Sequence, residues 1–207
     1  MEFGEIATSQ AEGAILAHSV KHAGGVFKKG RVLSAADITA ISGAGIATVF
    51  AARLSPGDVA EDEAAAAIAG IAGGAGTLAQ APFTGRANLH AGVAGMAVLD
   101  VDRVRALNRL HESLTLATVS NHAVVEERQM VATVKVIPFA VPRAVLDQAL
   151  RVIGDAPLIR VEAFKECRVG LVITRLPQTK PSIIAKSEEA MRERVSALGG
   201  LLGGVRV

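Results

Sequence analysis

The sequence has few aromatic residues: Phe, Trp and Tyr make up 3% of 207 residues, and Trp and Tyr are absent. Proteins that bind single-stranded nucleic acid stack bases on aromatic rings, and six scattered phenylalanines provide a poor platform. The formal net charge is only +2, and no dense run of Lys or Arg offers a surface for a phosphate backbone. We therefore expect no nucleic-acid partner.

Cysteine is almost absent, since Cys167 is the single one. It can form neither an internal disulfide nor a cysteine-rich zinc site, and we interpret it as a small apolar residue before a strand. The five histidines include no HExxH pattern. His18 and His22 are four residues apart but have no acidic residue in helical register. The sequence therefore predicts no metal site.

Long apolar runs are also missing. The stretch Ala64–Ala75 is apolar but too short and too rich in glycine to span a bilayer. The first residues, "MEFGEIATSQAEG", lack the basic and apolar regions of a signal peptide. Apolar residues make up 50% of the chain and charged residues 20%, which is typical of globular proteins. We expect a cytoplasmic protein with no membrane partner.

Predicted helices and strands alternate over residues 1–156, which indicates a mixed α/β region. Residues 12–20 form a predicted strand. Ser34 and Asp37 have the spacing of a capping box, and the β-branched "IATVFAARL" after that helix predicts a strand. The stretch "QMVATVKVIPFAVP" is apolar on both faces and is the best candidate for a central strand. Pro142 then predicts the start of a helix over Arg143–Ile153.

Four acidic residues precede or begin the Ala-rich segment: Asp58, Glu61, Asp62 and Glu63. We expect them in the first turns of a helix, where carboxylates complement the positive end of the dipole. This structural role accounts for the cluster without a metal ion.

Residues 157–207 predict the first β-α-β unit of a Rossmann-like domain. "LIRVEAF" is a short strand, "RVGLVITRL" a buried strand, and Ser182–Leu198 a helix whose apolar residues face inward. A second strand begins after it. The predicted fold is therefore α/β, with a domain boundary after residue 156 at the hinge-like Gly154–Pro157.

Two candidate binding sites lie in the first region. In "PFTGRANLH", Thr84, Arg86 and Asn88 offer a hydroxyl, a bidentate cation and an amide for an anion or polar heterocycle. The alternative is a loop held by its own Asn and Arg hydrogen bonds. Lys135 is a cation inside an apolar strand, where it either extends to solvent at an edge or meets a ligand. An autonomous enzyme built around Arg86 and Lys135 lacks a nucleophile and an oriented base.

A third candidate site is the loop "TRLPQTKPS" between the predicted buried strand and helix. In open α/β sheets, ligands bind at the carboxyl ends of strands. Thr174, Thr179 and Ser182 can donate hydrogen bonds, and Arg175 and Lys180 can pair with phosphate. The start of the helix also favours an anion.

Several segments resemble bacterial molybdopterin-binding proteins. "AEGAILAHSVKHAGGVFKKGRVLSAADITAISGAGIATVFAARLSPGDVAEDEAA", "FTGRANLHA", "LHESLTLATV" and "MVATVKVIPFAVP" are similar to their N-terminal region. "KKGRVLSAADITAISGAGIATV" is also similar to the molybdopterin molybdotransferase family. "RVGLVITRLPQTKPSIIAKSEEAMRERVSALGG" resembles the first strand, loop and helix of the molybdenum-cofactor-biosynthesis domain, a three-layer α/β sandwich.

The resemblance implies binding of molybdopterin, a pterin small molecule, with or without molybdate or Mg²⁺. By position, Thr174 matches the family's first strand–loop junction and Ser182 its following helix start. It also implies a molybdotransferase-like activity, or the binding head of a molybdenum cofactor nucleotidyltransferase. This sequence differs from the family in two respects. The family's first loop commonly carries acidic residues, whereas residues 175–180 contain none. The family's glycine-rich ligand loop would lie beyond Val207.

If the domain is truncated, we expect no cofactor. The alternative hypothesis is then a non-catalytic interaction module. It would dock through a sheet edge as a homo-oligomer or on another molybdenum cofactor enzyme. Its last segment would pack on the N-terminal region or on a partner.

Overall fold

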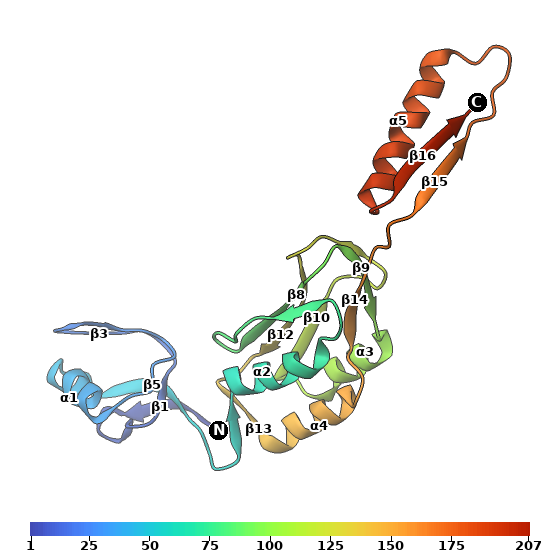
Figure 1. Ribbon diagram of the computed structural model, residues 1–207. Coiled ribbons are helices and arrows are strands. Elements are labelled where there is room, and N and C mark those ends of the chain that lie inside the picture. Colours follow the sequence, from blue (N-terminus) through green and yellow to red (C-terminus); the bar gives the residue numbers. More distant parts are fainter.

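The computed structural model describes all residues, 1–207, and shows a mixed α/β protein with five α-helices and several small sheets. The chain forms an N-terminal lobe, a central lobe and a C-terminal lobe, arranged in a row (Figure 1). The mixed α/β class predicted from the sequence is confirmed. None of the helices combines the length and the apolar character needed to cross a bilayer.

The N-terminal lobe is built on an antiparallel sheet with strand order β1-β5-β2, and a short hairpin β3–β4 extends from it. Its elements are β1 (Glu2–Ala7), the 3₁₀ turn η1 (Thr8–Gln10), β2 (Ile15–Leu16), β3 (Val20–His22), β4 (Gly25–Phe27), α1 (Ala35–Gly43) and β5 (Thr48–Arg53). The single strand predicted over residues 12–20 is wrong. The Ala17 N–H bonds the Phe50 carbonyl and the chain then leaves the sheet, so two short strands form instead.

The predicted capping box at the start of α1 is confirmed. The Ser34 hydroxyl accepts a hydrogen bond from the Asp37 N–H, and the Asp37 carboxylate accepts one from the Ser34 N–H. Arg31 adds two hydrogen bonds of 2.9 Å to the same carboxylate. Asp37 is thereby hydrogen-bonded although it is buried, which fixes the start of α1 to the preceding segment at Arg31 and Ser34.

The central lobe contains the larger core, with 27 buried apolar residues against 7 in the N-terminal lobe. Its sheets have the orders β10-β12-β8-β7, β11-β9-β14 and β13-β6, all antiparallel. The strands are β6 (Asp58–Ala60), β7 (Thr77–Ala79), β8 (Arg86–Ala91), β9 (Gly95–Leu99), β10 (Leu114–Thr118), β11 (Val124–Val125), β12 (Met130–Val136), β13 (Ala140–Pro142) and β14 (Ile159–Ala163). The helices are α2 (Glu61–Ala72), α3 (Val101–Leu110) and α4 (Arg143–Ile153).

Two predictions for this lobe are confirmed. Strand β12 lies between β10 and β8, as expected for a strand that is apolar on both faces. Helix α4 has the predicted bounds and buries Leu146, Ala149 and Ile153 along one face. This 3-and-4 spacing is what an amphipathic helix requires.

The Gly154–Pro157 turn, which the sequence indicated as a hinge, is fixed by hydrogen bonds from Arg103. Arg103 donates hydrogen bonds to the carbonyl oxygens of Ile153, Ala156 and Pro157. Strand β14 then pairs with β9 inside the central lobe. The domain boundary after residue 156 stays a prediction, but the chain leaves the central lobe only after β14.

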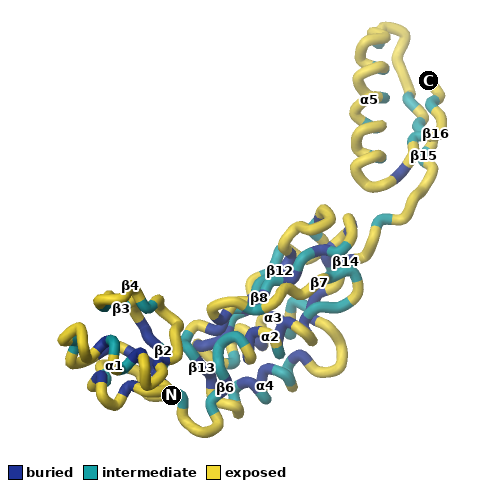
Figure 2. The backbone as a smooth tube through the Cα atoms, turned by 60° about the vertical axis from the view of Figure 1, so that its left-hand side comes forward, coloured by how far each residue is buried: buried dark blue, intermediate teal, exposed yellow.

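The C-terminal lobe is the predicted β-α-β unit. Strand β15 (Arg168–Val172) pairs in parallel with β16 (Leu201–Arg206), and α5 (Pro181–Ala197) connects them. The lobe projects away from the rest of the molecule, so the last segment does not pack on the N-terminal region (Figures 1 and 2). No hydrogen bond or ion pair joins residues 168–207 to residues 1–163.

The prediction that β15 is buried is wrong. Its residues alternate between exposed and half-buried, and α5 has no buried residue (Figure 2). Ile183 and Leu198, expected to face inward, are 55% and 47% exposed. One helix covers only one face of a two-stranded sheet, whereas buried parallel strands need both faces covered.

Candidate functional site

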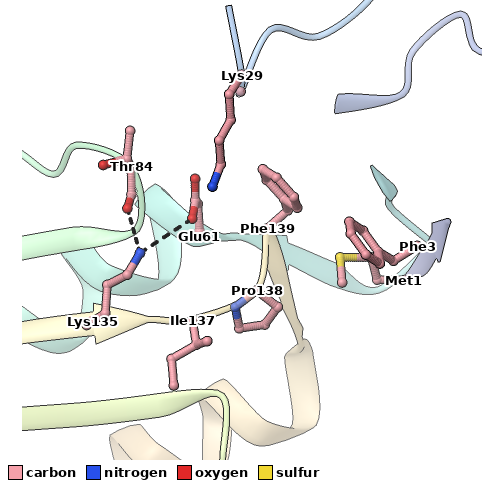
Figure 3. A pocket seen from close by; sticks show the side chains of 10 residues that line it. Met1, Phe3, Lys29, Glu61, Thr84, Lys135, Ile137, Pro138 and Phe139 are labelled. Atoms are coloured by element: carbon pink, nitrogen blue, oxygen red, sulfur yellow. Dashed lines mark hydrogen bonds and ion pairs between the residues drawn. The ribbon is translucent and has the colours of Figure 1, made fainter. Parts of the chain in front are cut away.

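A pocket of about 560 Å³ lies where the N-terminal and central lobes meet (Figure 3). Its volume is in the range of sites for small organic ligands. The N-terminal lobe contributes Met1, Phe3, Lys29 and Gly30 to the lining, and the central lobe contributes Glu61, Thr84, Lys135 and residues 137–139. Two of the sequence-predicted site residues, Thr84 and Lys135, are therefore brought together here.

Lys135 is the polar centre of the pocket. Its ammonium donates a 2.7 Å hydrogen bond to the Thr84 carbonyl and lies 3.9 Å from a carboxylate oxygen of Glu61. The side chain comes from an interior strand of the sheet, not from an edge, and is 30% exposed. Lys135 thus reaches partly into solvent at the pocket, where a ligand could meet it.

The Thr84–Gly85 turn lies against the Lys135 ammonium group, which it binds through the Thr84 carbonyl. The N–H of Phe83 bonds the Arg86 carbonyl and the N–H of Arg86 bonds the Phe83 carbonyl, so the turn closes a two-residue hairpin. Both central residues have positive φ, 48° at Thr84 and 70° at Gly85, as in a type I′ turn. A β-branched residue rarely adopts this conformation, so Thr84 is strained.

Neighbouring polar groups hold this strained turn. The Gly85 N–H donates a 2.6 Å hydrogen bond to Asp62, and Lys135 binds the Thr84 carbonyl. A Cβ at Gly85 would lie 2.5 Å from the Glu61 carboxylate and 2.6 Å from the Val136 carbonyl. Glycine is therefore required for the turn to approach β12 and α2 this closely.

Glu61 is the carboxylate of the pocket. Burial raises the pKa of its carboxyl group and nearby Asp62 adds to this, whereas the ammonium groups of Lys135 and Lys29 oppose it. Glu61 is the first residue of α2. The prediction that the acidic cluster begins this helix is confirmed for Glu61, Asp62 and Glu63, but Asp58 lies in β6 and pairs with the Met1 amino group.

Aromatic rings form the opposite wall. The rings of Phe3 and Phe139 are stacked with centroids 6.3 Å apart and an interplanar angle of 26°. The Lys29 ammonium lies 5.7 Å from the centre of the Phe139 ring, within the range of a cation–π contact. The pocket therefore combines an apolar wall with charged groups at its centre.

A row of polar side chains continues from the pocket along the outer face of the sheet. Arg86 is opposite Lys135 and Asn88 is opposite Thr133 in the β8–β12 ladder. Buried side-chain atoms without a hydrogen-bond partner are Asn88 Oδ1, Thr133 Oγ1 and His90 Nδ1. Most buried polar atoms are paired, so this face has unused hydrogen-bonding capacity beside the pocket.

The loop predicted around Arg86 and Asn88 is mostly strand. Both residues lie in β8, and only Thr84 and Gly85 form the turn. The interpretation in which Asn and Arg side chains hold this segment is wrong, because neither side chain makes a hydrogen bond or ion pair. The turn is held by Asp62 and Lys135 instead.

The remaining predicted site residues lie in the C-terminal lobe, on the loop between β15 and α5, remote from the pocket (Figure 1). The Thr179 hydroxyl accepts a hydrogen bond from the Leu176 N–H within the loop. Thr174, Arg175, Lys180 and Ser182 are exposed. Neither Arg175 nor Lys180 pairs with a carboxylate. The nine predicted residues therefore form two separate groups.

Of the 10 residues that line the pocket, sequence reasoning proposed only Thr84 and Lys135 as site residues and missed the others, including Phe3, Lys29, Glu61 and Phe139. Glu61 was recognised only as a helix-start residue. The one local signal was the position of Phe139 shortly after Lys135. No local pattern places Phe3 or Lys29 near the central lobe. In the whole structure, no group of three or more His, Cys, Asp or Glu residues is arranged to hold a metal ion.

Comparison with known proteins gives one match. The profile of a domain of unknown function, DUF8806, matches residues 5–53, which correspond to most of the N-terminal lobe. No curated protein and no solved structure matches the chain.

Proposed function

We propose that the protein binds molybdopterin in molybdenum cofactor biosynthesis, through the loop between β15 and α5. The observation that carries this proposal is the parallel β15–α5–β16 unit, since ligands of α/β folds bind at the carboxyl ends of parallel strands. The same segment resembles the first strand, loop and helix of the molybdenum-cofactor-biosynthesis domain. We also propose that this unit belongs to a three-layer α/β sandwich like that of the molybdenum-cofactor-biosynthesis domain.

The chemistry of the loop fits a phosphate-bearing pterin. Arg175 and Lys180 are exposed and unpaired, so both cations are free to bind a phosphate. The loop enters the N-terminus of α5, a 17-residue helix with no acidic residue in its first turn, and a helix N-terminus favours an anion. Thr174 and Ser182 add hydroxyl donors at the two ends of the loop.

Binding of purified molybdopterin to the whole chain tests this proposal. Because the protein has neither Trp nor Tyr, the near-UV absorbance of the pterin can be followed with little protein background. We expect saturable binding, with or without molybdate, which the double variant Arg175→Ala/Lys180→Ala weakens at least about tenfold. Lys186→Ala, an exposed change on α5, is the matched control. Absence of binding, or equal affinity of both variants, would refute the proposal.

A second candidate function is a non-catalytic interaction module. The C-terminal lobe favours it, because β15 and β16 have only each other as partners and Val172 and Leu201 are 73% and 51% exposed. Unpaired strand edges and exposed apolar faces commonly mark association surfaces. Sedimentation velocity distinguishes the two functions. Self-association that Val172→Lys abolishes supports the module, and a monomer that binds pterin supports the cofactor site.

A further inference from the structure

We propose that the pocket between the N-terminal and central lobes is a second binding site, for a small planar aromatic anion. Its position, lining and charge differ from those of the β15–α5 loop, so this site is independent of the proposed cofactor site. The argument rests on charge balance, the aromatic wall, the strained turn and the place of the pocket between two lobes.

The charge balance of the pocket favours an anion. Two ammonium groups, Lys29 and Lys135, accompany one carboxylate, Glu61. The Met1 amino group is already paired with Asp58 at 2.8 Å. No carboxylate lies within 4.0 Å of Lys29, and Lys135 is 3.9 Å from Glu61, longer than a close charge-assisted hydrogen bond. The lining therefore carries two ammonium groups against one carboxylate, a net positive charge.

The aromatic wall favours a planar ring. Phe3 is 57% exposed although it faces Phe139 in a stacked arrangement. A flat ring against these two side chains would remove apolar surface from water and gain an offset-stacked contact. Lys29 lies over Phe139 and can meet an anionic group attached to that ring. The pocket thus places an apolar contact and a cation side by side.

The strained turn is a further sign of a ligand site. Thr84 has φ 48°, and its carbonyl is directed to Lys135 inside the pocket. Backbone strain of this kind concentrates at ligand-binding sites, where the surrounding structure enforces it. Here the turn places the Thr84 carbonyl where it accepts a hydrogen bond from the Lys135 ammonium at the centre of the pocket.

The pocket also lies where the two lobes meet. No hydrogen bond joins residues 2–53 to residues 58–163. The stacked Phe3 and Phe139 and the Lys29–Phe139 contact cross between the lobes at the pocket. A ligand that touches Lys29 and Lys135 at once would therefore link the lobes as well as fill the pocket.

Titration of the whole chain with 2-naphthoate tests the proposal, with 2-naphthylmethylammonium as a cation of the same ring size. Fluorescence anisotropy of the ligand is the readout, since the chain has no Trp or Tyr. We expect one saturable site for naphthoate with a dissociation constant below about 1 mM, and clearly weaker binding of the cation. Binding that does not saturate, or a preference for the cation, would overturn the proposal.

Variants assign the binding to the pocket. Lys135→Met and Lys29→Met should each weaken naphthoate binding about tenfold, and Glu61→Gln should strengthen it severalfold because it removes the opposing charge. Lys28→Met is the matched control, since Lys28 is an exposed neighbour outside the lining. Lys29 is exposed, so Lys29→Met remains informative if Lys135→Met fails to fold. Equal affinity of Lys29→Met and Lys28→Met would overturn the assignment.

Discussion

The ammonium group of Lys135 lies 2.7 Å from the carbonyl oxygen of Thr84 and 3.9 Å from the carboxylate of Glu61. This contact joins an interior strand of the central sheet to the hairpin turn of β8 and to the first residue of α2. Three elements distant in sequence are thereby fixed around one charge. The contact shapes the pocket wall and explains why a cation occurs in an apolar strand.

Thr84→Asn should stabilise the protein. Asn adopts positive φ more readily than a β-branched residue and is preferred in type I′ turns. We expect a gain of about 1 kcal/mol in the free energy of unfolding of the central lobe, measured by urea denaturation. Thr115→Asn, a change on the regular strand β10, should give no gain. A loss of stability in Thr84→Asn would show that the threonine side chain itself holds the turn.

Gly85→Ala should destabilise the central lobe by about 1–3 kcal/mol. The residue has φ 70°, and a Cβ would collide with the Val136 carbonyl and the Glu61 carboxylate. Gly43→Ala in α1 is the control, because a Cβ there has nothing within 4 Å and alanine favours helix. Equal effects of the two changes on urea midpoints would contradict the required close approach.

The N-terminal lobe should lose stability in acid. Hydrogen bonds from Arg31, and then from the Ser34 backbone, lower the pKa of Asp37 from 3.8 to about 2. A carboxyl whose pKa is lower in the folded state stabilises the fold above its unfolded pKa. The contribution is therefore complete above about pH 4 and is lost as the pH falls towards about 2.

Amide exchange of α1 across this pH range measures the effect. Asp37→Asn should weaken α1 at neutral pH and abolish the dependence between about pH 4 and 2. Asp102→Asn, which changes an exposed carboxylate of the central lobe, should leave the α1 profile unchanged. An unchanged pH profile in Asp37→Asn would contradict the assignment.

Thr133→Val should raise the stability of the central lobe by about 1 kcal/mol. The Thr133 hydroxyl is buried without a partner, and valine has the same shape without the cost of an unsatisfied polar group. Thermal unfolding of Thr133→Val and Thr115→Val provides the comparison, because the Thr115 hydroxyl is not among the buried unpaired atoms. Destabilisation specific to Thr133→Val would mean that its hydroxyl has a hydrogen-bond partner in solution.

Elements with strong local signals could be predicted from the sequence. Ser34 and Asp37 form the capping box because both interactions are within one turn of helix. Pro142 and the spacing of Leu146, Ala149 and Ile153 define α4. The apolar character of both faces placed β12 inside the sheet. In each case the residues that determine the element are close together in the chain.

The pocket could not be predicted in this way. Lys135 was identified because a cation is unusual in an apolar strand, and Thr84 because it offers a hydroxyl in a glycine-containing loop. Their contact with Glu61, and with Phe3 and Lys29 of the other lobe, depends on pairing across many residues. The segment around Thr84–Gly85 was interpreted as a loop, and it does not carry the Asn-Gly pair that typically marks a type I′ hairpin. The apolar sequence of β15 likewise does not reveal how many layers cover it.

The C-terminal lobe is connected to the central lobe only by the polypeptide segment 164–167. No hydrogen bond or ion pair joins residues 168–207 to residues 1–163. Two parts of a protein unfold cooperatively only when contacts between them couple their stabilities. We therefore expect residues 168–207 to unfold separately from the central lobe, so that the whole chain unfolds in more than one step. The segment 164–167, backbone flanked by β14 and β15, is the natural place for a protease to separate the two units.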